Sequence, residues 1–190
     1  MAPDFFDFNN AGEQKSFDVI PDNTIATVQL TIRPGGAGEG GWLKHSKDGA
    51  SKMIDAELVV VDGPHAKRKI FQNFVISGTT QGHTEAAEIS RKTFAAMLES
   101  ARGIRPDDKS DTAQRARMVS GWQDFDGLRF VVRIGVQPPR NGYDARNMVR
   151  EIVTPERQQW KKPEQAIRPA AAGQPAAAPA NAIARPQWAG

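Results

Sequence analysis

Cations and aromatic rings recur in this sequence at positions that alternate with the apolar residues of its expected strands. Proteins that bind single-stranded nucleic acid combine cations that follow the phosphates with rings on which bases stack, each stack contributing roughly 1–3 kcal/mol. The candidate rings are Trp42, Phe71 and Tyr143. The candidate phosphate-binding side chains are Lys44, Lys47, Lys52, Lys67, Arg68, Arg129, Arg133, Arg140 and Arg146. The pattern predicts a sequence-tolerant surface for single-stranded DNA.

The other patterns that suggest chemistry are incomplete. Gly36, Gly38 and Gly41 have the spacing of a dinucleotide-binding loop, but the residues that follow do not form the helix that this loop requires. The three histidines are scattered and have no i+4 histidine or thiol partner. Asp55 and Glu57 share one face of a strand, and a metal-dependent nuclease built on them is the enzymatic alternative. We expect instead a protein with no catalytic residues, no metal and no cofactor.

Charge and composition limit the class of protein. The net charge is +3, and residues 156–190 alone hold five Lys and Arg against two Glu, so the rest of the chain is neutral overall. No apolar run reaches the roughly 18 residues of a membrane span, and the first residues do not resemble a secretory signal. Cysteine is absent, which excludes disulfides and thiolate metal sites and fits a reducing cytoplasm. We therefore expect a cytoplasmic protein with no membrane partner.

Hydrophobic periodicity predicts the elements that must position these residues. Alternation predicts strands, and an i, i+3, i+4, i+7 apolar pattern with Thr84 as N-cap predicts a helix. The expected strands span 24–33, 53–62, 67–77, 127–136 and 143–153, and the expected helices span 84–103 and 111–119. A helix between the third and fourth of five strands is the arrangement of the oligonucleotide-binding (OB) barrel. The glycine-rich loop 34–52 then flanks the binding face. Trp42 in this loop either contacts the bound DNA strand or caps the barrel as a core residue.

The two ends of the chain differ from the middle in composition. Residues 1–22 form an acidic and aromatic lead-in segment, in which we expect the phenylalanines to pack onto the domain. The OB-like domain spans 23–155. Residues 156–190 are rich in proline and alanine, which predicts a disordered tail. Arg185 and Trp188 near its end are the candidate partner-binding residues.

Three short segments resemble a family of phage and prophage proteins long labelled as of unknown function. They are the run Lys67–Phe74, the helix from Phe94 to Gly103, and the run Tyr143–Val149. The resemblance, which covers roughly residues 20–155, implies an OB-like single-stranded-DNA-binding protein that acts with phage replication or recombination proteins inside a bacterial host. The tip of the tail departs from that of bacterial single-strand binders, because it lacks acidic residues.

A second class of protein accounts for the same elements. A protein-interaction or virion-associated β-barrel adaptor would have the same core and tail but would not bind oligonucleotides. Either class is compatible with a homo-oligomer. Binding of single-stranded DNA that weakens as salt rises would separate the two.

Overall fold

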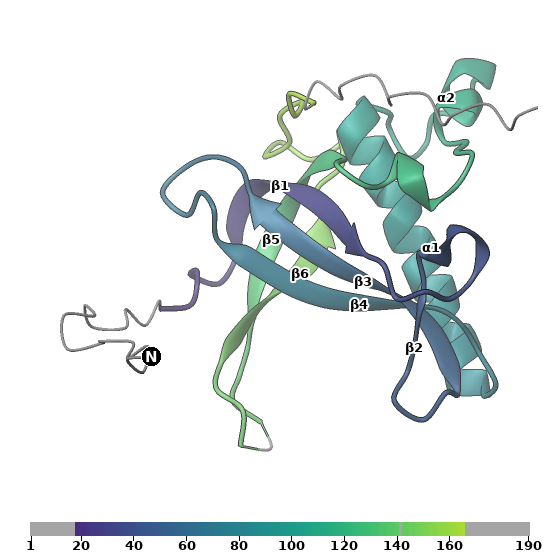
Figure 1. Ribbon diagram of the computed structural model, residues 1–190. Coiled ribbons are helices and arrows are strands. Elements are labelled where there is room, and N and C mark those ends of the chain that lie inside the picture. Colours follow the sequence, from purple (N-terminus) through teal and green to yellow (C-terminus); the bar gives the residue numbers. More distant parts are fainter. Residues whose placement is uncertain (1–17, 141, 166–190) are drawn as a thin grey trace, which may run out of the picture.

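Alternation of apolar and polar residues produces six antiparallel strands in one open, twisted sheet (Figure 1). The computed structural model describes residues 18–140 and 142–165. The strands are β1 (Thr24–Arg33), β2 (Lys44–His45), β3 (Ser51–Val60), β4 (Lys69–Gly78), β5 (Arg129–Gln137) and β6 (Arg146–Ile152). The prediction of a mainly β fold is confirmed. The short strand β2 lies inside the segment that was expected to be loop.

Strand β1 lies at the centre of the sheet, because it pairs with β3 along one edge and with β5 along the other. Strand β4 continues the sheet beyond β3, β6 continues it beyond β5, and β2 pairs with the start of β3. No backbone ladder joins β4 to β6 in the part of the chain that the structure describes, so the sheet is open where a closed barrel was predicted. Across this β4–β6 gap, the side-chain oxygen Oε1 of Gln72 accepts a hydrogen bond from the backbone N–H of Val149 at 3.1 Å.

Helix α1 (Gln81–Arg102) follows β4 and packs against the sheet. It begins three residues before the predicted start, because Thr80 is the N-cap and its side chain accepts a hydrogen bond from the N–H of His83. The helix ends at Gly103, whose left-handed φ of 72° favours glycine. A second helix, α2 (Asp111–Ala116), and two short 3-10 helices, Glu39–Gly41 and Trp122–Asp124, lie in the connections.

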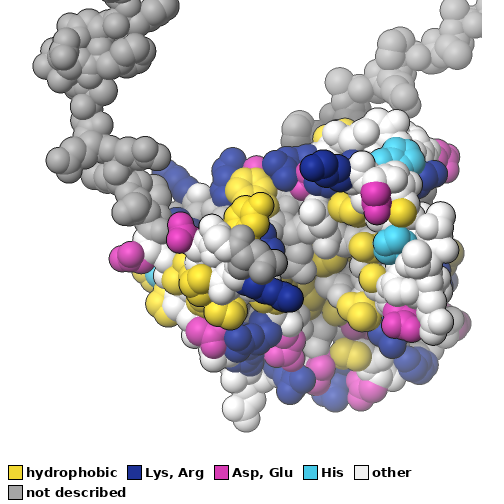
Figure 2. All heavy atoms as spheres, turned by 90° about the horizontal axis from the view of Figure 1, so that it is seen from below, with side chains coloured by type: hydrophobic (Ala, Val, Ile, Leu, Met, Phe, Trp, Pro, Cys, Tyr) yellow, Lys and Arg dark blue, Asp and Glu magenta, His cyan; other side chains and the backbone are white. Residues whose placement is uncertain are grey.

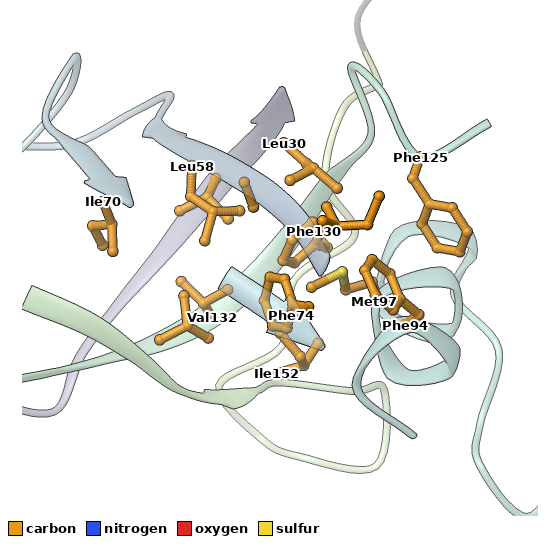
Figure 3. Packing of buried hydrophobic residues seen from close by; sticks show 14 of the residues in the cluster. Leu30, Leu58, Ile70, Phe74, Phe94, Met97, Phe125, Phe130, Val132 and Ile152 are labelled. Atoms are coloured by element: carbon orange, nitrogen blue, oxygen red, sulfur yellow. The ribbon is translucent and has the colours of Figure 1, made fainter. Parts of the chain in front are cut away.

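The core lies between α1 and the inner side of the curved sheet. Figure 3 shows Phe94 and Met97 of α1 beside Phe74 of β4 and Phe130 of β5. The ring of Phe94 is 5.2 Å from that of Phe74 and 4.9 Å from that of Phe125, measured between centroids. Because these rings come from separate parts of the chain, they fix the helix to the sheet and to the connection before β5.

Residues 153–165 fold back over the outer side of β5; we call them the C-terminal segment. The indole N–H of Trp160 donates to the carbonyl of Ser100 at 3.1 Å, and the Trp160 ring lies close enough to Gly103 that a Cβ there would be 3.4 Å away. The Gln165 amide accepts from the N–H of Arg129 and donates to the carbonyls of Arg129 and Ala101. The prediction of disorder from residue 156 is therefore wrong for residues 156–165, because composition says nothing of specific anchors such as Trp160.

The lead-in segment also joins the sheet. Ile20 is buried, and the Asn147 side-chain amide bonds to both its N–H and its carbonyl at 2.8 Å. Residues 1–17, with the expected packing of Phe5, Phe6, Phe8 and Phe17, and residues 166–190, with the expected disorder and with Arg185 and Trp188, lie outside the described residues. Among the residues that are described, no helix is both long enough and apolar enough to cross a membrane.

Candidate nucleic-acid interface

The outward side chains of β1, β3 and β4 form a surface that we call the β1–β3–β4 face. Its members are Thr31, Arg33, Asp55, Glu57, Lys69, Phe71 and Asn73, with Lys44 of β2 at its edge. Phe71 points outward because Ile70, Gln72 and Phe74 alternate to the inner side of β4, and it stays 51% exposed. The Arg33 guanidinium carbon lies 4.8 Å from the centroid of the Phe71 ring. The part of the ring that Arg33 leaves exposed is a site on which a base can stack next to a phosphate-binding group.

Asp55 holds two cations of this face in place. Its carboxylate is 2.5 Å from the Arg33 guanidinium and 2.6 Å from the Lys44 ammonium. Burial acts to raise the pKa of Asp55, but the hydrogen bonds from Lys44 and Arg33 outweigh it, and the pKa lies below the usual value of 3.8. Asp55 is therefore ionised at neutral pH and fixes Arg33 where it covers Phe71.

We expect Asp55→Asn to destabilise the fold at neutral pH and to cost progressively less in acid. The pKa of Asp55 is lower folded than unfolded, so its contribution is fully present above the unfolded value of 3.8 and is lost as the pH falls through the folded value. Urea unfolding of both proteins from about pH 7 to about pH 2.5 measures the difference. Asp62→Asn, in the exposed loop after β3, is the control and should follow the parent protein. A penalty for Asp55→Asn that is independent of pH would contradict this assignment.

The cations of the face extend further into solvent than its carboxylates. Lys69 pairs with Glu57 at 2.8 Å. The side chains of Arg33, Lys44 and Lys69 are 48%, 32% and 53% exposed, whereas those of Asp55 and Glu57 are 13% and 18% exposed. A phosphate that approaches therefore meets ammonium and guanidinium groups before it meets a carboxylate. Each cation also keeps N–H donors that its carboxylate does not use.

The loop between β1 and β3 continues from one end of this face. Trp42 is half-buried and packs against the core, and Gly40 lies against its ring. Trp42 is therefore a core-packing residue and not an exposed ring on which a base could stack. Lys47 is exposed in this loop, and Lys52 is half-buried on β3 beside β2. Of the candidates in this part of the chain, Lys44 is the one that the structure brings to the face.

The connection from β5 to β6 gathers a second set of candidates. Arg140 and Tyr143 exchange two backbone hydrogen bonds of 3.1 Å, which close a hairpin around a tip that projects from the body (Figure 1). Tyr143 is 78% exposed. Arg146 follows at the start of β6, and its Nε–H donates a hydrogen bond to Oε1 of Gln137 at 2.8 Å. Residues 137–146 thus place one ring and two guanidinium groups around a hollow of about 200 Å³.

Lys67 and Arg68 lie just before β4. Lys67 is exposed and has a left-handed φ of 69°, unusual for a residue other than glycine. The Arg68 guanidinium donates to the carbonyl of Asp18 at 2.6 Å. Arg68 therefore holds the lead-in segment, and Lys67 is the more accessible of the two.

Arg129 and Arg133 lie on β5, separated from β4 by two strands. Arg129 donates to the side chain of Gln29 at 2.9 Å and to the carbonyl of Glu164 at 3.2 Å. Arg133 pairs with Glu151 at 3.2 Å. Both therefore lie on the outer side of the sheet but two strands away from Phe71, and each is engaged by other residues. Alternation predicted correctly that both point outward, but it does not reveal which strands are neighbours or that the C-terminal segment lies over β5.

Two cations of the β1–β3–β4 face were absent from the predicted set. Arg33 and Lys69 each occupy an outward position in their strands, and that signal was available in the sequence. Their importance depends on register, because Arg33 pairs opposite Asp55 and Glu57 pairs opposite Phe71. Figure 2 shows how basic side chains are interleaved with hydrophobic and acidic ones over one side of the molecule.

The carboxylates do not assemble into a metal site within the described residues, where no group of three or more His, Asp or Glu side chains is placed to hold an ion. No protein-family model matches the sequence, and comparison with curated proteins finds no match.

Proposed function

We propose that this chain is a non-enzymatic, sequence-tolerant single-stranded-DNA-binding protein, and that its sheet acts as an OB-type barrel. The strand order supports this proposal, because a central first strand pairs with the second and fourth long strands, and a helix connects the third to the fourth. The Gln72–Val149 hydrogen bond supports it as well, since it brings β4 and β6 to the two sides of one narrow gap.

The observation that carries the proposal is the half-exposed ring of Phe71 beneath Arg33. The ring lies among cations that Asp55 and Glu57 hold in place. A base that stacks on Phe71 would leave its phosphates beside Arg33, Lys44 and Lys69. The hairpin, with Arg140, Tyr143 and Arg146, offers a second contact for a longer strand.

The proposed biological setting rests on the resemblance in residues 67–74, 94–103 and 143–149. We assign the chain to phage DNA replication or recombination in the cytoplasm of a bacterial host. Replication or recombination proteins would bind Arg185 and Trp188 near the C-terminus. Co-purification of such a protein with the whole chain, but not with Trp188→Ala, would test that role.

Affinity for oligothymidine is expected to fall roughly 50-fold between 50 and 200 mM salt, if about four phosphates are neutralised. The counted cations are Arg33, Lys44, Lys69 and the exposed Lys47. Fluorescence anisotropy of an end-labelled oligothymidine, repeated at four or more salt concentrations, gives the slope. A duplex of equal length is the control and should bind more weakly, because its bases cannot reach Phe71. Absence of binding at low salt would favour the protein-interaction adaptor instead.

A further inference from the structure

A groove runs between α1 and the sheet on the side of the β4–β6 gap, and it borders the β1–β3–β4 face at Asn73. It consists of two hollows of about 410 and 220 Å³ that share Gln72, Ile89 and Thr93. We call it the helix groove. Its walls are residues 72–75 of β4, residues 149–152 of β6, and Ala86, Ile89, Ser90, Lys92, Thr93 and Ala96 of α1. Ile89 is 65% exposed, so the groove presents apolar surface that nothing among the described residues covers.

The strands that border the groove have unpaired edges. Within the described ranges, β4 pairs with no strand other than β3, and β6 pairs with no strand other than β5. An elongated apolar groove between a helix and two strands is a setting in which an extended peptide can pack. The groove therefore suits a segment of chain better than a small molecule.

Charge selects the kind of segment. Arg150 pairs with Asp22 at 2.8 Å, and Glu151 pairs with Arg133 and Arg157. Lys92 makes no hydrogen bond or ion pair within the described part of the chain, so it is the uncommitted charge of the groove. An occupant that combines apolar rings with carboxylates would complement both Ile89 and Lys92.

The N-terminal part of the chain enters at the same gap. Ile20 is buried there and bonded twice to Asn147 of β6, and Arg68, directly before β4, binds the carbonyl of Asp18. Residues 1–17 thus continue from a point beside the start of β4, and they include Asp4, Phe5, Phe6, Asp7 and Phe8. Ten residues from Phe8 to Asp18 span up to about 33 Å, whereas Gln72 lies only about 13 Å along the strand from Arg68.

We propose that the acidic, aromatic segment Asp4–Phe8 docks in the helix groove of its own chain, with phenylalanine rings against Ile89 and a carboxylate beside Lys92. The proposal is independent of nucleic-acid binding, because the groove and the β1–β3–β4 face do not share residues other than Asn73 at their border.

The absence of cysteine from the chain allows a direct test by cross-linking. Asn9→Cys is combined with Ala86→Cys, which lines the groove, or with Ala87→Cys, which is also half-buried but lines the other side of α1 with Ile76. With a short bis-maleimide, we expect the Ala86→Cys pair to form the intramolecular cross-link at least tenfold faster. Intact mass and peptide mapping identify the product, and unchanged thermal unfolding shows that both variants fold.

Equal rates for the two pairs, or faster reaction of the Ala87→Cys pair, would overturn the proposal. A cross-link found only between two chains would overturn it too, since the occupant would then come from a second copy. In the Ala86→Cys background, Lys92→Glu should slow the reaction at least threefold, whereas Arg91→Glu on the other side of α1 should not. Equal slowing by both substitutions would remove the assigned role of Lys92.

Discussion

Phe71→Ala should weaken binding of oligothymidine roughly 5- to 140-fold, the loss that corresponds to one base stack of about 1–3 kcal/mol. Phe71 is half-exposed on the outer side of β4, so the loss should fall on binding and not on folding. Phe71→Trp should retain most of the affinity, because any flat ring can support a base. Anisotropy titrations at low salt measure the effect, with urea unfolding as a check on stability.

Met118→Ala is the matched control for this substitution. Met118 is 72% exposed and follows α2, away from the β1–β3–β4 face, so its removal should leave affinity unchanged. If both alanine variants bind as the parent protein does, Phe71 is not a stacking platform and the proposed function loses its main support. If both weaken binding equally, the interaction is with exposed apolar surface in general.

Phe94→Ala should lower the free energy of unfolding by about 3–5 kcal/mol, the usual cost of removing a buried phenylalanine. Phe94 is 5% exposed and packs against the rings of Phe74, Trp122 and Phe125 at 5.2, 5.2 and 4.9 Å. Its removal leaves a cavity where α1, β4 and the connection before β5 meet. Urea unfolding followed by far-ultraviolet circular dichroism gives the value.

Glu88→Ala, six residues earlier in α1 and exposed, is the control and should change stability by less than about 0.5 kcal/mol. A loss for Phe94→Ala no larger than that of Glu88→Ala would mean that the aromatic cluster does not hold α1 to the sheet. Phe94→Leu should fall between the two, because it restores part of the buried volume.

The periodicity of the sequence was enough to locate the long strands and the main helix. Val28, Leu30 and Ile32 point inward as their alternation predicted, and the expected helix ends at Gly103 as it does in the structure. The start of α1 was misplaced because Thr80 and Thr84 are both acceptable caps, and only the hydrogen bond to His83 distinguishes them. Periodicity reports which side of an element is buried, but it does not decide between two nearby caps.

The candidate interface was harder to predict, because it depends on register and on what covers each strand. Phe71 was assigned correctly to an outward position, but its neighbours Arg33 and Asp55 come from two other strands. Trp42 was left between surface and core, and its packing against the core follows from a loop whose path no local pattern encodes. Arg129 occupies an outward position as Arg33 does, but its guanidinium donates a hydrogen bond to the carbonyl of Glu164 in the C-terminal segment.

The two hydrogen bonds that Gln165 donates to Ala101 and Arg129 have a consequence for the whole stretch between α1 and β5. That stretch begins after the end of α1 and ends at the start of β5, and the single Gln165 amide is hydrogen-bonded at both points. Gln165 thus joins the two ends of a stretch that begins more than sixty positions before it in the chain. A shorter version of the protein that ended after β6 would keep every strand. It would lose the hydrogen bonds from Gln165 that join the two ends of this stretch.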